Sequence, residues 1–264
     1  MMIIAITMQK GGTGKTTTAA ALAQAGASRG ARILAVDIDP QANLSYALGV
    51  DGDAEHNSYN LFIGKEAGEQ ILTSADGVDV IPAVWALASV TSGRGSARRL
   101  QEALQPVKND YDLIIIDTPP TAGELQYNAL QAADTYLIPI NADIYNLQSL
   151  EQTIAAAEAI RETNRGLAPC GILLTQYAGK TEIETQMFRE IINRAAGELH
   201  IQYLGAIRPA AKVREAAALQ RSLYEYAPTC TAAKDYLNIF HYLTNYEFAG
   251  KTSKQREDKD NGRS

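Results

Sequence analysis

Residues 9–16 read Gln9-Lys10-Gly11-Gly12-Thr13-Gly14-Lys15-Thr16. This glycine-rich run follows an apolar stretch, Ile3–Ile6, and precedes an alanine-rich stretch that spans residues 17–27. A strand, a glycine loop and a helix in this order are typical of a phosphate-binding loop, because glycines let backbone N–H groups turn toward an anion and the helix presents its positive N-terminus. Lys15 can reach terminal phosphates, and the Thr16 hydroxyl can ligate Mg²⁺. We therefore expect the chain to bind a nucleoside triphosphate.

The loop departs from the usual pattern G-x-x-x-x-G-K-[ST], because Gln9 stands where the first glycine belongs. A second lysine, Lys10, opens the loop instead. The alternative interpretation is a plain glycine turn with unrelated lysines. The position of Gly14, Lys15 and Thr16 between a strand and a helix argues against that alternative.

The composition excludes several classes of protein. The chain has 264 residues and a formal net charge of −6, so it is not basic all over and any nucleic-acid binding must use a local patch. Its two cysteines, Cys170 and Cys230, provide no disulfide framework, and its three histidines are far apart and form no metal motif. This composition fits a globular protein of a reducing compartment.

Short apolar runs alternate with helix-like segments, which predicts an α/β fold: a doubly wound, mainly parallel sheet flanked by helices. Strands are expected at Ile3–Thr7, Arg32–Val36, Val78–Pro82, Leu113–Ile116, Thr135–Ile140, Gly171–Thr175 and Ile201–Ala206. Helices are expected at Lys15–Arg29, Ala97–Leu104, Glu124–Ala132, Leu147–Thr163, Ile183–Ala196, Val213–Leu219 and Ala232–Tyr246. Residues 1–248 are expected to form a single domain, and the charged residues 249–264 a disordered tail.

Two acidic motifs are expected at the same edge of the sheet as the glycine loop, because ligands of open parallel sheets lie beyond the carboxyl ends of the strands. Asp37 and Asp39 follow one apolar strand, and Asp117 ends another. The Asp117 carboxylate would hold Mg²⁺ as a Walker B residue, typically through a water, and a carboxylate of the first pair can orient the attacking water. As an isolated pair, Asp37 and Asp39 would be plain turn residues before Pro40.

Together these motifs resemble the ParA/MinD family of deviant Walker A ATPases, which have a P-loop NTPase fold. The matching stretches are KGGTGKTTT (residues 10–18), DIDPQANLS (37–45), DLIIIDTPP (112–120) and ILLTQY (172–177). The resemblance extends from about residue 3 to residue 243. Within the family, the run 37–45 and the segment 207–228 look most like the short ParA-type (Soj-like) partition ATPases, which have no added N-terminal DNA-binding domain.

The resemblance implies a set of nucleotide-binding residues: Lys10, Gly11, Gly12, Thr13, Gly14, Lys15, Thr16, Thr17, Thr175 and Pro209. In the family, the first lysine crosses an ATP-bound homodimer to the partner's phosphates, so Lys10 would couple dimerisation to catalysis as an arginine finger supplied in trans does. Gly12 would lie at the dimer face, where a side chain would clash. Thr17 would donate to the α-phosphate, while Thr175 and Pro209 would contact adenine.

The resemblance also implies the chemistry. The cofactors are ATP and Mg²⁺, the metal residues are Thr16, Asp37 and Asp117, and the catalytic residues are Lys10, Lys15 and Asp39. Asp39 orients the attacking water, with Asp37 as a supporting group near the metal. The implied activity is a slow, Mg²⁺-dependent hydrolysis of ATP to ADP and phosphate, which a ParB-type centromere-binding protein stimulates.

ParA proteins bind nonspecific double-stranded DNA as ATP dimers, so the resemblance implies a basic patch. The candidates are Lys180, Arg189, Arg208, Lys212, Arg214 and Arg221. Phosphate contacts need only lysine and arginine, and a dimer would double the patch. The alternative for each residue is a solvated charged face, and Glu215 and Glu225 dilute the patch. The expected function is segregation of plasmid or chromosomal DNA, in the cytoplasm and at the nucleoid.

Three other functions use related nucleotide sites. A MinD-like ATPase cycles on membranes or positions protein clusters, but residues 251–264 contain no leucine, isoleucine, valine or phenylalanine for a membrane-inserting face, so no membrane partner is expected. An iron–sulfur reductase would need a cysteine pair that bridges two subunits, and neither cysteine follows the nucleotide motifs as that role requires. A scaffold that binds nucleotide without turnover would not need both lysines and the acidic residues together.

Overall fold

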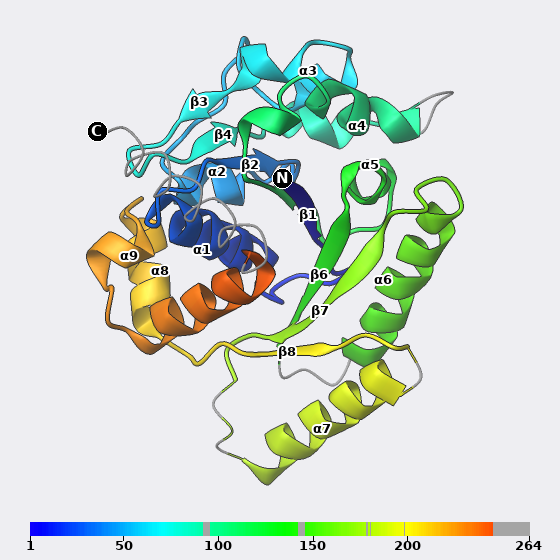
Figure 1. Cartoon of the computed structure of the whole chain (residues 1–264), viewed down its shortest axis with the longest axis vertical. Helices are drawn as coiled ribbons and strands as arrows, with labels where there is room; N and C mark the ends of the chain where they lie inside the picture. Colours follow the sequence, from blue (N-terminus) through cyan, green and yellow to red (C-terminus); the bar gives the residue numbers. More distant parts are fainter. Residues whose placement is uncertain (92–95, 142–145, 178, 180, 198, 245–264) are drawn as a thin grey trace, which may run out of the picture.

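The computed structural model describes residues 1–91, 96–141, 146–177, 179, 181–197 and 199–244 of the chain (Figure 1). Its strands are β1 (Met2–Ile6), β2 (Ile33–Asp37), β3 (Leu72–Thr73), β4 (Asp79–Ile81), β5 (Leu113–Asp117), β6 (Thr135–Ile140), β7 (Ala168–Leu174) and β8 (Tyr203–Ala206). Its α-helices are α1 (Lys15–Ala27), α2 (Asn43–Ala47), α3 (Tyr59–Phe62), α4 (Arg99–Leu104), α5 (Glu124–Ala132), α6 (Asn146–Arg161), α7 (Glu182–Gly197), α8 (Ala211–Ala218), α9 (Leu223–Tyr226) and a helix over residues 231–244. Short 3₁₀ helices span Ala67–Gln70, Trp85–Ser89, Ser96–Arg98 and Lys108–Asp110.

The strands form one sheet in the order β3-β4-β2-β5-β1-β6-β7-β8, and every neighbouring pair is parallel except β3 and β4. The first strand, β1, lies inside the sheet, and the chain adds strands on both of its sides. This is a doubly wound arrangement, so the predicted fold class is confirmed. In the part of the chain that the structure describes, no helix combines the length and the apolar character that a membrane span needs.

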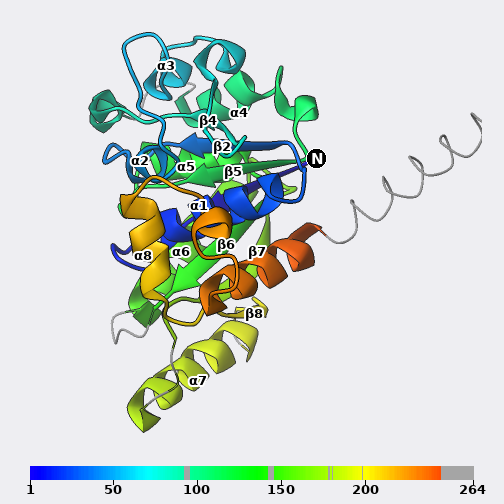
Figure 2. The same cartoon turned by 90° about the vertical axis from the view of Figure 1, so that its left-hand side faces the viewer.

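Alternate residues of the strands point to opposite faces of the sheet and bury two apolar layers. On β5, Ile114 and Ile116 join the layer under α4, α5, α6 and α7, whereas Leu113 and Ile115 join the layer under α1, α2, α8, α9 and the helix 231–244. Figures 1 and 2 show these two groups of helices on opposite sides of the sheet. Burying each such side chain stabilises the fold by about 1.5–3 kcal/mol. Because both faces are covered, the strands are continuous apolar runs.

The strand register brings the predicted acidic residues to one edge of the sheet. Ile6 at the end of β1 pairs with Asp117 at the end of β5, and Asp37 at the end of β2 pairs with the same Asp117. Because these three strands are adjacent and parallel, the loops that follow them leave the sheet side by side. The glycine loop, Asp37 and Asp117 therefore share one carboxyl edge.

The helix that follows the glycine loop is held close to the sheet. A Cβ on Gly26 would lie 2.5 Å from Cδ1 of Ile33, so a larger residue in the last turn of α1 would force the Ile33 side chain on β2 to shift. On its other side, Thr18 Oγ1 and Tyr236 Oη lie 3.3 Å apart and share a hydrogen bond. Helix α1 is thus fixed between the sheet and the helix 231–244, and it cannot shift without disturbing both.

Most elements lie within a few residues of their predicted bounds, and the helix Glu124–Ala132 and the strand Thr135–Ile140 match in full. Strand β7 begins three residues earlier than predicted, at Ala168, because its pairing with β6 extends there and Thr135 Oγ1 donates to the Ala168 carbonyl (2.8 Å). The sequence did not indicate β3, α2, α3 and α9, which are too short to show a period. That residues 1–248 form a single domain stays a prediction, and the predicted tail, residues 249–264, lies outside the described residues.

Candidate functional site

The loop between β1 and α1 keeps its shape through contacts with two neighbouring strand ends. Gly12 (φ +74°) and Gly14 (φ +92°) adopt left-handed backbone conformations that glycine takes without a steric penalty. Thr175 Oγ1 donates to the Thr13 carbonyl (2.8 Å), and Asn141 Nδ2 donates to the Gly12 carbonyl (3.2 Å). Two loop carbonyls are therefore bonded to the protein, which suits a loop whose N–H groups receive an anion.

The residue that replaces the first loop glycine ties the loop to two helices. The Gln9 backbone N–H donates to Thr153 Oγ1 on α6 (3.0 Å), and Gln9 Nε2 donates to Gln126 Oε1 on α5 (2.9 Å). Gln126 is fully buried, and its Nε2 donates in turn to Thr7 Oγ1 (2.8 Å). The departure from the usual loop pattern is thus explained, because the Gln9 side chain anchors the segment that leads into Lys10.

The two residues at the start of α1 meet the edge of the sheet. Thr16 Oγ1 donates to Asp117 Oδ2 (2.7 Å), and Lys15 Nζ donates to the Lys10 carbonyl (2.9 Å). Asp117 is fully buried, and among the described residues its Oδ1 atom has no hydrogen-bond partner. A buried carboxylate oxygen beside a threonine hydroxyl is a pair of ligands that suits a hard divalent cation.

Burial dominates the electrostatics at this edge. Desolvation raises the pKa of Asp117 well above its usual range, and the nearby Asp37 charge raises it further. Burial lowers the pKa of Lys15, although the Asp117 and Asp39 charges oppose that shift. The acidic and basic groups therefore face one another in a poorly solvated space, where each interaction with a bound charge is strong.

The two aspartates after β2 have different environments. Both carboxylate oxygens of Asp37 accept hydrogen bonds from the chain that follows: Oδ1 from the Asp39 N–H (3.1 Å), and Oδ2 from the Ser45 N–H (2.8 Å) and hydroxyl (2.7 Å). Burial raises the pKa of Asp37 to about 6. Asp39 accepts from the Gln41 N–H (3.0 Å) and lines the adjacent cavity. Asp37 thus anchors the loop that presents Asp39.

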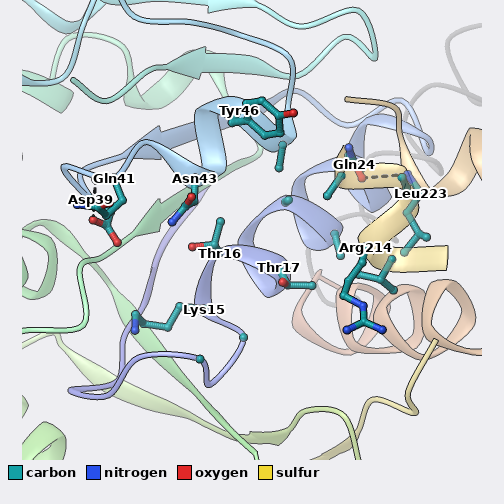
Figure 3. Close-up of a pocket in the computed structure, with 18 of the residues that line it drawn as sticks. Lys15, Thr16, Thr17, Gln24, Asp39, Gln41, Asn43, Tyr46, Arg214 and Leu223 are labelled. Carbon is teal, nitrogen blue, oxygen red and sulfur yellow. Dashed lines mark hydrogen bonds between the residues drawn. The ribbon is translucent and has the colours of Figure 1, made fainter. Parts of the chain in front are cut away.

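A cavity of about 560 Å³ opens between the glycine loop, α1, α2 and α8 (Figure 3). Lys15, Thr16 and Asp39 line one part of it. The cavity continues along one face of α1 to Gln24, and α8 closes it with residues that include Arg214. Figure 3 shows Lys15 and Asp39 at one end and Arg214 at the other. The cavity is large enough, and suitably charged, for a ligand with several phosphates.

A second cavity of about 400 Å³ adjoins the first on the other side of Asp39. The two cavities share Asp39, Gln41 and Pro120 among their lining residues. Trp85, the single tryptophan of the chain, stands at this second cavity with 70% of its surface exposed. Asp39 can therefore be reached from two sides, which leaves room for water next to any ligand of the first cavity.

Known proteins are similar in sequence to this chain over most of its length. A family model described as an AAA domain matches residues 1–168. The chromosome-partitioning ATPase Soj of Thermus thermophilus is 35% identical over 238 residues, which cover 89% of this chain and 92% of that protein. The chromosome partitioning protein ParA of Caulobacter vibrioides is 31% identical over 257 residues, which cover 94% and 95%. The chain belongs to the ParA/MinD family. The resemblance seen in the motifs is thereby confirmed.

Solved structures of similar fold agree with this assignment. The structure of cobyrinic acid a,c-diamide synthase from Mycobacterium smegmatis, with a bound ATP analogue and magnesium, superposes with a TM-score of 0.80 at 25% identity. The superposition covers 94% of this chain and 96% of that chain. The whole ParA/MinD architecture, from β1 to the helix 231–244, is therefore shared and not only the nucleotide motifs.

The structure places most of the predicted nucleotide-binding residues of this ParA/MinD chain around the first cavity. The lining includes Gly11, Gly12, Gly14, Lys15, Thr16, Thr17 and Asp39. Four predicted residues are not among the lining residues. They are Lys10, the buried Thr13 and Thr175, whose backbone carbonyl and hydroxyl are bonded to each other, and the exposed Pro209. Their predicted roles stay predictions. Gln176, which directly follows Thr175, and Val213 line the cavity.

The predicted DNA-binding residues do not form one uniform patch. Arg208 is paired with Asp235 (2.7 Å), Lys212 with Glu215 (2.7 Å) and Arg221 with Glu225 (3.9 Å). Arg189 is exposed on α7, and Lys180 lies outside the described residues. The pairs of Lys212 and Arg221 are exposed on both sides and contribute little, so these two cations can exchange their carboxylates for phosphates. Arg214 and Arg221 also line the cavity.

Sequence reasoning missed several polar residues that belong to the site, Gln24 and Asn43 among them. Gln41 and Gln176 line the cavity, and Gln126 holds Gln9 in place. Gln41 and Gln176 each follow a predicted residue by one or two positions, so the sequence signal was their nearness to Asp39 and Thr175. No signal pointed to Gln126, because its role arises from the packing of α5 against the loop.

Proposed function

We propose that the chain is a ParA-type partition ATPase that dimerises with ATP, binds nonspecific DNA and segregates plasmid or chromosomal DNA with a ParB-type partner. The observation that carries this proposal is the convergence of Lys15, Thr16, Asp39 and Asp117 at the glycine loop, with the Lys10 carbonyl bonded to Lys15. The naming of the Thermus thermophilus relative as a chromosome-partitioning ATPase supports it.

The geometry supports Mg²⁺ and ATP as the cofactors. Asp117 Oδ1, which has no hydrogen-bond partner among the described residues, and the Thr16 hydroxyl would hold Mg²⁺ together with phosphate oxygens and waters. Bound Mg²⁺ would neutralise part of the phosphate charge there. Both Asp37 oxygens are already bonded, so Asp37 acts on the metal from a distance and through the loop it anchors.

Hydrolysis needs little beyond positioning and charge neutralisation. Asp39 stands on the cavity wall between two open spaces, where its carboxylate orients a water toward the terminal phosphate. When ATP binds, Lys15 Nζ leaves the Lys10 carbonyl and bonds to the phosphates. A neutral hydrogen-bond acceptor is thereby replaced by a charged one, which binds the lysine more strongly. This division of labour makes Lys15 the ligand for ATP and Asp39 the residue that sets turnover.

Dimerisation completes the site. Lys10 from each protomer reaches the phosphates bound to the other, as an arginine finger in trans does, so ATP joins the two chains and turnover separates them.

Lys10→Ala is expected to abolish ATP-dependent dimerisation, measured by light scattering with ATP, with ADP and without nucleotide. Lys65→Ala, which removes an exposed lysine away from the loop, is the control and should dimerise as the wild type does.

The proposed DNA surface uses the outward basic residues of the segment 208–221 and α7, doubled by the dimer. Lys212→Ala should lower the slope of log affinity against log salt by about 1 for each phosphate contact that is lost. Arg161→Ala on α6 is a matched control, because Arg161 also forms an exposed pair with a carboxylate three residues away. If both variants bind DNA as the wild type does, Lys212 is not part of the surface.

The decisive experiment measures binding to a random-sequence duplex at fixed moderate salt with ATP, with ADP and without nucleotide. Asp39→Ala provides a form that keeps ATP. Binding with ATP alone supports the proposal and the nucleoid-associated, cytoplasmic location that follows from it. No binding in any state, despite an ATP-dependent dimer, would reject the DNA function and favour a membrane or protein-cluster cargo, which sedimentation with liposomes would separate.

A further inference from the structure

Two buried polar side chains from neighbouring helices hold the chain where β1 leads into the glycine loop. Gln126 on α5 and Thr153 on α6 are both fully buried, and the two helices lie side by side (Figure 1). The Gln126 amide uses both of its ends: Nε2 donates to Thr7 Oγ1 (2.8 Å), and Oε1 accepts from Gln9 Nε2 (2.9 Å). Gln126 therefore bridges the residue that follows β1 and the residue that precedes Lys10.

Burial makes this bridge costly to break. A buried amide that loses its partner costs more free energy than the hydrogen bond itself contributes, because water cannot replace the partner. Thr153 holds the backbone in the same way: its Oγ1 accepts from the Gln9 N–H (3.0 Å) and donates to the Ser149 carbonyl (2.7 Å). Gln9 is thus held by its main chain and its side chain together, which fixes the direction in which the chain enters Lys10.

The chain after Lys10 has a different support. Gly11 and Gly12 are exposed, and a Cβ on either would meet nothing within 4 Å. On that side, the Lys10 carbonyl accepts from Lys15 Nζ (2.9 Å). In the proposed function Lys15 gives up this bond, because it turns to the phosphates when ATP binds. Gln9 and its two buried partners keep their bonds, so they still hold the segment that leads into Lys10.

We propose that Gln126 is a positioning residue for Lys10: through Gln9, it aims the lysine at the phosphates bound to a second copy of the chain. The inference rests on the proposed function, because the direction of Lys10 matters only if the lysine acts in trans. Glutamine at position 9, where the usual loop has glycine, supplies the side chain that the arrangement needs. Gln126 does not line the nucleotide cavity, so it acts on dimerisation through the loop and not on the binding of nucleotide to one chain.

The test compares two equilibria for Gln126→Met, which keeps the length of the side chain but has no amide. Sedimentation equilibrium with a nonhydrolysable ATP analogue and Mg²⁺ measures the dissociation constant of the dimer. Calorimetry with ADP and Mg²⁺ measures the affinity of one chain for nucleotide. The dimer should weaken about 10- to 100-fold, because a symmetric dimer contains the lost bond twice. The affinity for ADP should not change, because Lys15 and Thr16 keep their positions.

Gln131→Met is the matched control. Gln131 lies at the far end of α5, is 2% exposed and accepts from Thr163 Oγ1 (2.6 Å) through its Oε1, so the variant removes a comparable bond from the same helix. It should lose thermal stability as Gln126→Met does but dimerise as the wild type does. Gln9→Met cuts the bridge from its half-buried end. The double variant of Gln9 and Gln126 should dimerise no more weakly than either single variant, because both changes remove one bond.

The outcomes separate the two proposals. A wild-type chain that stays monomeric with the ATP analogue would refute the proposed dimer and this inference with it. Wild-type dimers together with undiminished dimerisation of Gln126→Met would overturn the inference alone. An equal loss for Gln131→Met, or a parallel loss of ADP affinity, would also overturn it, because either result indicates a general loosening of α5 or of the loop. If thermal melts show that Gln126→Met is unfolded, Gln126→Asn decides, since its buried amide is one methylene too short to reach Gln9.

Discussion

Thr16 Oγ1 donates to Asp117 Oδ2 across 2.7 Å, although 101 residues separate the two in the sequence. The bond joins the first turn of α1 to the last residue of β5, inside the fully buried edge of the sheet. Among the described residues, the second Asp117 oxygen has no hydrogen-bond partner. The fold therefore keeps a poorly compensated carboxylate where a metal–phosphate complex is proposed to bind, which favours the loaded state over the empty one.

The first prediction concerns the stability of the empty protein. A carboxyl whose pKa is raised on folding stabilises the native state below its ordinary pKa of 3.8, and it loses that contribution as pH rises through the raised value. Asp117→Asn keeps the acceptor for Thr16 but removes the ionisable group. Without nucleotide, its melting temperature should exceed that of the wild type at pH 8 by on the order of 5 °C. The difference should shrink toward pH 5.

Two measurements accompany that comparison. Asp117→Asn should hydrolyse ATP poorly, so that a gain in stability appears together with a loss of function. Asp51→Asn alters an exposed acidic residue and should change neither property. Equal melting temperatures for Asp117→Asn and the wild type at pH 8 would mean that the ionised carboxylate is already compensated in the empty protein.

The second prediction concerns Asp39. Asp39→Ala should bind ATP and dimerise but hydrolyse ATP on the order of 100-fold more slowly, because it loses the group that orients water. Single-turnover hydrolysis measures this effect without interference from product release. Asp39→Asn keeps an acceptor for the Gln41 N–H, so it shows whether loop distortion explains the loss. Normal turnover in both variants would remove Asp39 from the mechanism.

The sequence predicted the edge of the site because strand ends in a parallel sheet share one edge. The glycine loop, Asp37 and Asp117 each follow an apolar run, so their convergence required only the correct topology. The order of the strands did not predict that Asp37 anchors the loop while Asp39 faces the cavity. It arises from the short helix α2, which brings Ser45 back to Asp37 and has no sequence period of its own.

The sequence also could not predict the direction in which individual side chains point. That Thr175 contacts adenine stays a prediction, and the sequence did not indicate that its hydroxyl donates to the Thr13 carbonyl. Lys212 and Arg214 read as one basic cluster, and the helix turns them to different sides. Composition supplies the charges, but the rotation of α8 against α1 decides which charge faces a ligand, and that rotation depends on packing over the whole sheet.

The third prediction separates Lys15 from the stability of the fold. Lys15→Ala should fold, because the hydrogen bond that Lys15 Nζ donates in the empty protein goes to the Lys10 carbonyl, which water can replace. Nucleotide binding should then be lost. In thermal melts, ADP with Mg²⁺ at 100 times the dissociation constant should stabilise the wild type by about 2.7 kcal/mol and leave the variant unchanged. An equal shift in both would show that Lys15 does not bind the phosphates.

The last prediction isolates the dimer face from backbone strain. Gly12 has φ +74°, and a Cβ there would meet nothing within 4 Å in the single chain. Gly30, at the far end of α1, has φ +76° and is equally open. Gly12→Val and Gly30→Val should therefore impose a similar conformational cost of about 1–3 kcal/mol and both remain folded. Only Gly12→Val should stay monomeric with ATP in light scattering, because only its side chain would clash with a second protomer. If Gly12→Val dimerises as Gly30→Val does, the glycine loop does not lie at the face that joins the two chains.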